Sequence, residues 1–298
     1  MKAPVLKNCS GLDLDWATVA SQSIYQPEIY LEKLCDMSSK NQWDLAEMDW
    51  DKIDFSALPQ SVRQGLVNIF TQIHYGEVTA LVGASALVEH APTTNVRSFA
   101  TFQAADEARH VKWFSMLIKK LDCRAKVLPT VALLMKDINS GETLEEKTLG
   151  MHLLVESMAH TIFSECSKAV KDLSFFERNI SPVRKLIPVF GEWLPDYLMK
   201  DEELHLNFGV YFLHERLKNM PFKKRHELEE KVTHWGELFL QVVDDPSILA
   251  MPGMDSKAIG IRCIEDINAR LASVGLESRI PSLKSLDKLL SPHSSTAH

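Results

Sequence analysis

Two Glu-x-x-His pairs, each preceded by an aspartate, constrain this chain more than any other feature. The first pair lies in Asp106-Glu107-Ala108-Arg109-His110 and the second in Asp201-Glu202-Glu203-Leu204-His205. Residues three apart share one face of a helix, so the Glu and the His of each pair can reach a single point. Both pairs interrupt apolar stripes of helical period, which predicts two long helices that bring these polar groups into a core.

Two more glutamates interrupt apolar stripes in the same way. Residues 61–89 form a helical pattern with Glu77 at its centre, and residues 143–173 form another that contains Glu156. The paired motifs belong to patterns over residues 96–121 and 195–217, and Pro188 and Pro195 are expected to disrupt a continuous helix before the second motif. The chain is therefore predicted to be all-α, with four long core helices.

The turn between the first two helices predicts their register. Ala91-Pro92-Thr93-Thr94-Asn95 breaks the helical pattern and can cap the next helix. Glu77 lies fifteen residues before Pro92, and Glu107 lies fifteen residues after it. Both helices of an antiparallel hairpin rise equally per residue, so the two carboxylates should meet at one height.

The six polar residues match a known kind of metal site. One Glu from each of two helices and a Glu-x-x-His from each of two others form a carboxylate-bridged di-metal centre in a four-helix bundle. Two divalent cations would offset four buried carboxylates, and ligands without thiolates suit iron or manganese better than zinc. Glu165 and Glu203 compete for ligand places, but their phase and spacing favour structural roles. The predicted ligands are Glu77, Glu107, His110, Glu156, Glu202 and His205.

Composition narrows the functional classes. The 298 residues carry a net charge of −7 without a long basic block, which argues against a nucleic-acid partner. Five scattered cysteines form no C-x-x-C pair, as is typical of a reducing cytosol. No signal peptide is visible, and the most apolar run, residues 80–88, is too short to span a membrane. We therefore expect a cytoplasmic protein.

The flanking regions are expected to pack on the bundle. Residues 1–58 are predicted to be an irregular arm whose tryptophans are buried for their area. The bundle would extend over residues 59–245, with a helix near residues 223–243. Residues 246–298 would hold a last helix, near 256–275, and a frayed tail.

Residues 60–217 resemble the ferritin-like di-iron carboxylate superfamily. The first motif is most similar to the Asp-Glu-x-Arg-His motif of bacterial multicomponent monooxygenase hydroxylase subunits and their short relatives. By this resemblance Asp106 would orient His205, while Asp201 would orient His110 and pair with Arg109. Leu204 stands where the second motif would have an arginine, so one of the two supporting bridges is expected to be missing.

The resemblance implies an O₂-activating oxygenase with two Fe, or Mn and Fe, that acts on a small organic substrate. Electrons would come from a reductase, and the protein is expected to be a homodimer. His152 and His160 lie four residues before and four residues after Glu156, on the same helix face. They could be buried core histidines, or one of them could be an extra metal ligand or a proton donor. Candidate pocket residues, each of which could equally be core packing, are Ala80, Leu81, Ala84, Phe114, Phe163 and Phe208.

Three alternatives stay open from the sequence. A ribonucleotide reductase small-subunit relative would need a radical tyrosine, which by resemblance lies four residues after the first motif histidine. Phe114 occupies that place. An acyl desaturase has similar ligand spacing, and an iron-handling protein is the non-enzymatic alternative.

Overall fold

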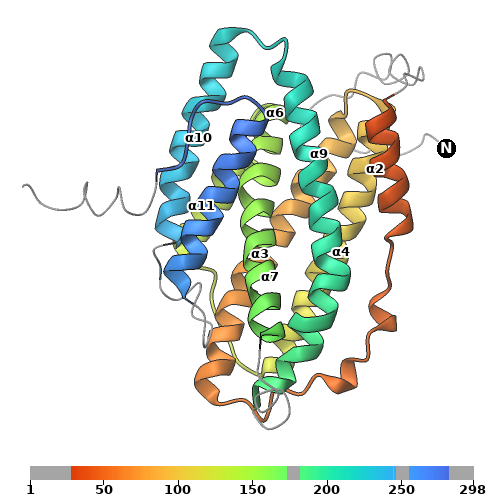
Figure 1. Cartoon of the computed structure of the whole chain (residues 1–298), viewed down its shortest axis with the longest axis vertical. Coiled ribbons are helices and arrows are strands. Elements are labelled where there is room, and N and C mark those ends of the chain that lie inside the picture. The colour runs from red at the N-terminus through yellow and green to blue at the C-terminus, as the bar shows by residue number, and fades with distance from the viewer. Residues whose placement is uncertain (1–27, 173–181, 244, 246–254, 282–298) are drawn as a thin grey trace, which may run out of the picture.

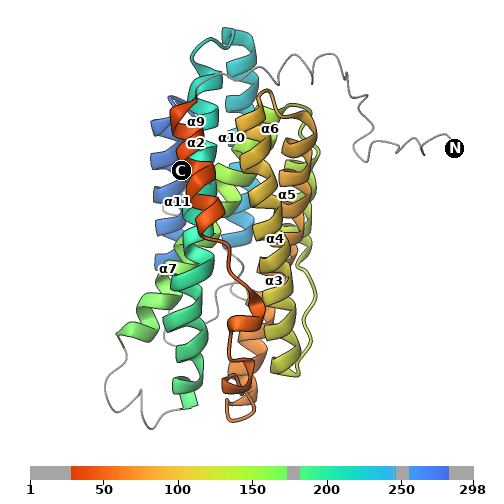
Figure 2. The same cartoon turned by 90° about the vertical axis from the view of Figure 1, so that its right-hand side faces the viewer.

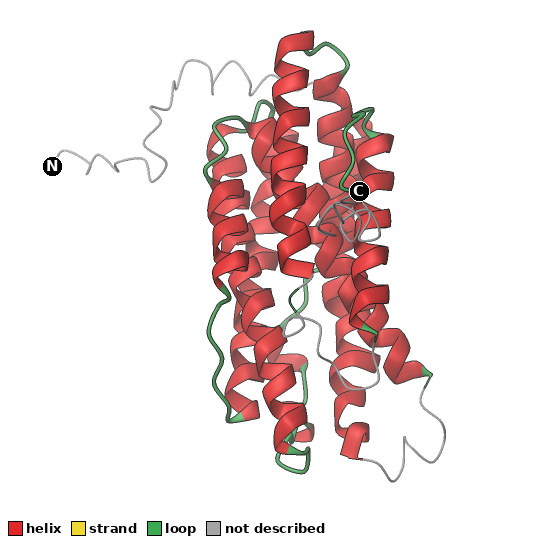
Figure 3. Cartoon of the chain, turned by 90° about the vertical axis from the view of Figure 1, so that its left-hand side faces the viewer, coloured by secondary structure: helices red, strands yellow, loops and turns green. Residues whose placement is uncertain are grey.

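Four antiparallel helical runs form the centre of the molecule in the computed structural model, which describes residues 28–172, 182–243, 245 and 255–281 (Figure 1). The core runs are α3 (Gln60–His90), α4 (Thr94–Leu121), the run α6–η3–α7 (Leu144–Thr148, Leu149–Glu156 and Ser157–Lys171) and the run η5–α9 (Ile187–Leu198 and Met199–Leu217). The predicted all-α bundle is confirmed. Within the described residues every regular element is helical, as Figure 3 shows.

The α3–α4 hairpin has the predicted register. Thr93 caps α4, since its Oγ1 accepts a hydrogen bond from the backbone N–H of Val96 at 3.3 Å. Apolar residues of both helices are buried on one side, and Glu77 and Glu107 lie among them at 5% and 1% exposure. Their ligand atoms lie within 4.8 Å of one another, so the hairpin delivers both carboxylates to one height in the interior.

Two π-helical segments distinguish the other two core runs. In η3 the wide turns end at Glu156, and η5 leads directly into α9, which carries the second motif. The expectation that Pro188 and Pro195 would break a continuous helix is wrong. Pro188 lies at the start of η5 and Pro195 lies inside it. A π-helical turn changes the hydrogen-bonding pattern of the backbone, which accommodates a residue without an N–H.

The segment before the bundle is more regular than predicted. Residues 1–27 of the predicted arm lie outside the described residues. The described part begins with α2 (Ile29–Lys40), followed by two single 3₁₀ turns, Leu45–Glu47 and Trp50–Lys52. Leu31 and Leu34 of α2 are buried in one apolar cluster with residues of α4 and α9. Figures 1 and 2 show α2 lying along these two helices. The chain then descends along the bundle to the start of α3.

Three outer helices complete the fold. They are α5 (Pro129–Asn139), α10 (Phe222–Val243) and α11 (Ser256–Ser273), and the last two lie close to the predicted positions. Trp235 of α10 is fully buried and donates a hydrogen bond from Nε1 to Asp137 of α5 at 2.7 Å. The predicted frayed tail lies outside the described residues. None of the described helices combines the length and apolar character that a membrane crossing requires.

Candidate metal centre

Six buried side chains from four helical runs converge at the middle of the bundle. The ligand atoms of Glu77, Glu107 and His110 lie within 4.8 Å of one another, and so do those of Glu107, Glu156 and His205. Glu202 completes the cluster, with Oε1 3.3 Å from His110 Nδ1 and Oε2 3.8 Å from His205 Nδ1. The structure thus brings together all six residues predicted as ligands.

Two of the glutamates lie between the histidines. Glu107 places Oε2 3.6 Å from His110 Nδ1 and Oε1 3.3 Å from His205 Nδ1, and Glu202 is divided between the two rings in the same way. Glu77 approaches only His110, at 3.3 Å, and Glu156 only His205, at 3.9 Å. The cluster therefore has a His110 side with Glu77 and a His205 side with Glu156, which share Glu107 and Glu202.

The unsatisfied atoms of this cluster fit metal ions. Glu107 Oε2, Glu156 Oε2 and His205 Nδ1 are buried without a hydrogen-bond partner. An unpaired buried polar atom costs about 1–3 kcal/mol, so such atoms are expected where a cation completes the site. The donors are four carboxylates and two imidazoles, a set suited to two divalent ions such as iron or manganese.

Without metal, protons must neutralise part of the cluster. Burial raises the pKa of Glu77 and of Glu156 well above the usual value for a carboxyl group. Burial opposes charge on His110 and His205 as well, but the surrounding acids outweigh it and raise both pKa values well above the usual value. Burial also disfavours ionised Glu202, yet the neighbouring imidazoles of His110 and His205 lower its pKa to about 2. Bound cations would displace these protons.

An aspartate of the opposite motif holds each histidine. His110 Nε2 lies 3.2 Å from Asp201 Oδ2, and His205 Nε2 lies 3.2 Å from Asp106 Oδ2. These hydrogen bonds are the ones that the resemblance implied. Because each hydrogen bond fixes Nε2 of its imidazole ring, Nδ1 of the same ring is turned towards the carboxylates of the cluster.

The arginine of the first motif is arranged differently from the expectation. Arg109 pairs closely with Asp106 in its own motif and donates to Gln42 Oε1 at 2.7 Å. It reaches Asp201, its expected partner, only at 3.9 Å.

The segment after α2 supplies support that the sequence analysis missed. Asn41 Nδ2 donates to Asp201 Oδ1 at 2.7 Å, and Trp43 Nε1 donates to Asp201 Oδ2 at 2.8 Å. Gln42 Nε2 donates to Asp106 Oδ1 at 3.2 Å. The expected arrangement is therefore reversed: Arg109 holds Asp106, and this segment holds Asp201, which was expected to pair with Arg109. No spacing pattern could have indicated this, because Asn41 and Asp201 are 160 residues apart.

The two histidines beside Glu156 have different surroundings. His152 is buried and its Nε2 lies 3.0 Å from Oε1 of Gln103, a buried residue of α4 that was not among the predicted site residues. Burial lowers the pKa of His152 to about 3, so the ring is neutral. His160 is partly exposed, and burial together with nearby Arg270 of α11 lowers its pKa. Glu165 pairs with Arg262 of α11 and Glu203 is exposed, in agreement with structural roles.

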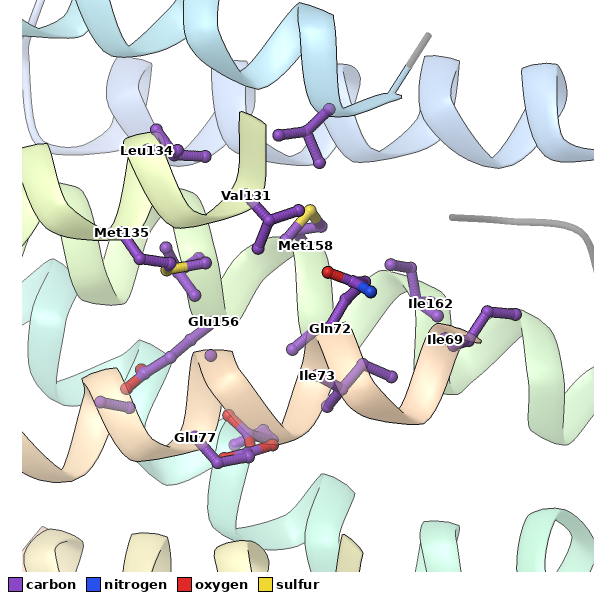
Figure 4. A pocket seen from close by; sticks show the side chains of 16 residues that line it. Ile69, Gln72, Ile73, Glu77, Val131, Leu134, Met135, Glu156, Met158 and Ile162 are labelled. Atoms are coloured by element: carbon purple, nitrogen blue, oxygen red, sulfur yellow. The ribbon is translucent and has the colours of Figure 1, made fainter. Parts of the chain in front are cut away.

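A narrow apolar cavity of about 50 Å³ borders the cluster. It lies between α3, α5 and the η3–α7 run, where Glu77 and Glu156 line one part and Met158 and Ile162 line another (Figure 4). Glu202 lines it as well. Of the candidate pocket residues, Ala80 lines this cavity. Phe114 and Phe163 stack at 6.0 Å within the main core, while Phe208 stacks on Phe99 at 4.4 Å.

Comparisons with known proteins agree with this architecture. The sequence profile of the Methane/Phenol/Alkene Hydroxylase family matches residues 50–128, which include Glu77 and the first motif. No curated protein matches the chain. The dimanganese(II) form of NrdF from Streptococcus sanguinis superposes with a TM-score of 0.65 at 12% identity, over 91% of this chain and 94% of that chain.

Two point mutants of an R2-like ligand-binding oxidase, with Mn/Fe cofactors reconstituted anaerobically and aerobically, are also similar. Both superpose with a TM-score of 0.53 at 18% identity over 82% of this chain, and over 92% and 93% of theirs. The resemblance to the ferritin-like superfamily is thereby confirmed at the level of the fold. The chain is a ferritin-like helical bundle with a buried cluster able to hold two metal ions.

Proposed function

We propose that this protein is an oxygenase that uses two iron ions, or one manganese and one iron, to oxidise a small organic substrate with O₂. The observation that carries the proposal is the apolar cavity that reaches Glu77, Glu156 and Glu202. A cavity that opens onto the carboxylates of a di-metal cluster can hold a substrate next to the reacting centre. The apolar lining favours a substrate, or part of one, without charge.

The residues that would hold the metals are the six of the cluster. Glu77 and His110 would bind one ion, Glu156 and His205 the other, with Glu107 and Glu202 between them. When bound, the metal pair supplies the electron-transfer chemistry that activates O₂. Asp106 and Asp201 would keep each Nδ1 oriented to bind an ion, and the apolar walls would exclude water from the substrate.

The reaction requires an electron donor. Inserting one atom of O₂ into a C–H bond and reducing the other to water consumes two electrons and two protons. A separate reductase is therefore part of the proposal.

We also propose a homodimer. Between Arg63 and Glu89, α3 contains a single residue of the types Asp, Glu, Lys and Arg, which is the buried Glu77. Val78 and Val82 expose 37% and 55% of their surface on the outer side of that helix. Such an uncharged face suits contact with a second copy of the chain. Light scattering of the unmutated protein and of Val82→Glu tests this, since the charge should produce monomers.

The relatives found by fold support one alternative, an oxidase of the R2 type. Phe114 occupies the place where the resemblance puts a radical tyrosine, and it is buried between Phe70, Trp113 and Phe163. The alternative predicts an EPR-detectable tyrosyl radical in the oxidised, unmutated protein. Our proposal predicts none, and it predicts that Phe114→Tyr folds without altering the products.

The central experiment follows the fate of oxygen. Metal analysis of the purified protein should give close to two ions per chain, and zinc alone would contradict the proposal. The anaerobically reduced protein is then mixed with ¹⁸O₂ and a panel of small hydrocarbons, alcohols and aromatics. We expect one ¹⁸O atom in the product. Oxygen consumption without label in any product would favour an oxidase or an iron-handling protein.

A further inference from the structure

A buried glutamine links the His205 side of the centre to a histidine that is not one of the six ligands. Gln103 lies one helical turn before Glu107 on α4, and His152 lies in η3 four residues before Glu156. Both side chains are 1% exposed. Gln103 Nε2 lies 2.7 Å from Glu156 Oε1 and 3.3 Å from Glu107 Oε1, and Gln103 Oε1 lies 3.0 Å from His152 Nε2.

The chemistry of these groups fixes which way the amide points. With metal in place of the protons, Glu156 and Glu107 would be ionised and could only accept hydrogen bonds, so the NH₂ end of Gln103 must face them. Its carbonyl oxygen then faces His152, which has to donate from Nε2. A flipped amide would place its carbonyl oxygen against the oxygen of Glu156, with two acceptors at 2.7 Å and no proton between them. His152 therefore holds the amide in the orientation that supports Glu156.

Packing leaves His152 little freedom to move. Gly209 of α9 faces it so closely that a Cβ at position 209 would lie 2.4 Å from the Cβ of His152. The imidazole also packs against the ring of Phe208, with 5.5 Å between centroids. Since the ring is held from the α9 side, the donor at Nε2 has a fixed position.

The other side of the centre is built differently. In the part of the chain that the structure describes, the hydrogen-bond partner of Glu77 is His110, and no amide donates to it. Glu77 and Glu156 are otherwise equivalent, each facing one histidine. The chain from His152 through Gln103 thus makes the two sides unequal.

We propose that His152 and Gln103 are positioning residues for Glu156, which make metal binding on the His205 side depend on a hydrogen-bond donor at position 152. This inference rests on the metal centre proposed above. It assigns His152 neither as a ligand nor as a core histidine without a role. The orientation of Gln103 would place one oxygen of Glu156 and leave Oε2, which has no hydrogen-bond partner, for the ion.

The test is a titration of the full-length metal-free protein with Mn²⁺, followed by EPR. Two adjacent Mn²⁺ ions couple magnetically, while a single bound ion gives a distinct signal. The unmutated protein should bind two ions. His152→Leu should weaken the position on the His205 side by about 10-fold or more, in the range usual for residues that orient ligands. Gln103→Leu also removes the contact with the shared Glu107 and should weaken that position at least as much. A singly occupied form should then accumulate.

Two ligand variants identify the position affected. In a Glu77→Gln background, where the His110 side is disabled, His152→Leu should weaken the remaining site. In a Glu156→Gln background it should change almost nothing, because the carboxylate that it positions is gone. His152→Gln keeps a donor near the place of Nε2 and should recover most of the affinity.

Gln72→Leu is the matched control. Gln72 is also a buried glutamine beside the cavity, but it donates to the backbone of Asn68 and Lys126 and not to the cluster. It should lower the thermal midpoint without changing the ratio of the two Mn²⁺ affinities. Equal weakening of both positions by His152→Leu, or no rescue by His152→Gln, would overturn the positioning role. Failure of the unmutated protein to bind two Mn²⁺ would overturn the metal centre as well.

Discussion

The two motifs hold their histidines alike but secure their aspartates by different means. In the α4 motif, Asp106 is followed three residues later by Arg109, which pairs with it. In the α9 motif, Leu204 occupies the corresponding place and is buried in an apolar cluster with Leu31 and Leu34 of α2. Asp201 instead accepts hydrogen bonds from Asn41 and Trp43, which follow α2 in the chain.

The difference shows how an extension outside the bundle can replace a residue inside it. A leucine on α9 gives α2 an apolar surface on which to pack, and the end of α2 then carries an amide and an indole to Asp201. A buried carboxylate requires compensation, but neutral donors can supply part of it. Both His–Asp hydrogen bonds consequently have the same length of 3.2 Å.

The largest expected effect tests whether the two motifs share one centre. Glu107→Gln or Glu202→Gln should weaken both Mn²⁺ positions, each by more than about 100-fold, because these carboxylates lie between the histidines. Glu77→Gln and Glu156→Gln should each weaken mainly one position. Calorimetry and EPR of the four variants measure this. Loss of a single ion on changing Glu107 would separate the motifs into independent sites.

Leu204→Arg tests why the second motif lacks its arginine. The side chain at position 204 is 5% exposed among apolar neighbours, so an arginine there would bury a charge. We expect a loss of about 3 kcal/mol in the free energy of unfolding, measured in urea. The control Leu204→Met should cost less than about 1.5 kcal/mol. A stable Leu204→Arg variant with unchanged α2 protection in hydrogen exchange would contradict the proposed packing.

A fall in pH should weaken Mn²⁺ binding on both the His110 side and the His205 side of the centre. The pKa values of His110 and His205 are both raised, so protons compete with metal on both sides. Mn²⁺ affinity should fall as the pH falls, by about tenfold per pH unit for each proton displaced. Because these two histidines have a higher pKa in the folded than in the unfolded state, their protonation stabilises the metal-free protein at low pH. This stabilisation is lost as the pH rises through the folded-state pKa values. The gap between the thermal midpoints of the loaded and metal-free forms should therefore widen towards alkaline pH.

The smallest expected effects come from the residues that hold the two aspartates, Arg109 at Asp106 and Asn41 at Asp201. Arg109→Leu should weaken mainly the His205 side through Asp106, and Asn41→Ala mainly the His110 side through Asp201, each by about 10-fold. Asn41→Ala and Asp201→Ala should be less than additive, whereas Asn41→Ala and Arg109→Leu should add. Should Arg109→Leu couple more strongly to Asp201→Ala than to Asp106→Ala, the observed pairing within the first motif would be wrong.

The sequence by itself determined the four core helices and the composition of the cluster. Helical period alone places Glu107 with His110 and Glu202 with His205, and equal spacing about Pro92 brings Glu77 to the height of Glu107. These relations depend on local geometry, which repeats along any helix. They could therefore be derived before any contact was known.

Only the tertiary structure decided which side chains support the cluster. His152 and Gln103 are 49 residues apart, and Trp43 and Asp201 are 158 apart, so their contacts follow from the packing of separate elements. The backbone through Pro195 also depended on context, since a π-helical segment tolerates a residue that ordinary helical rules exclude. Local periodicity specifies which face a residue occupies, but packing selects the partner that it meets there.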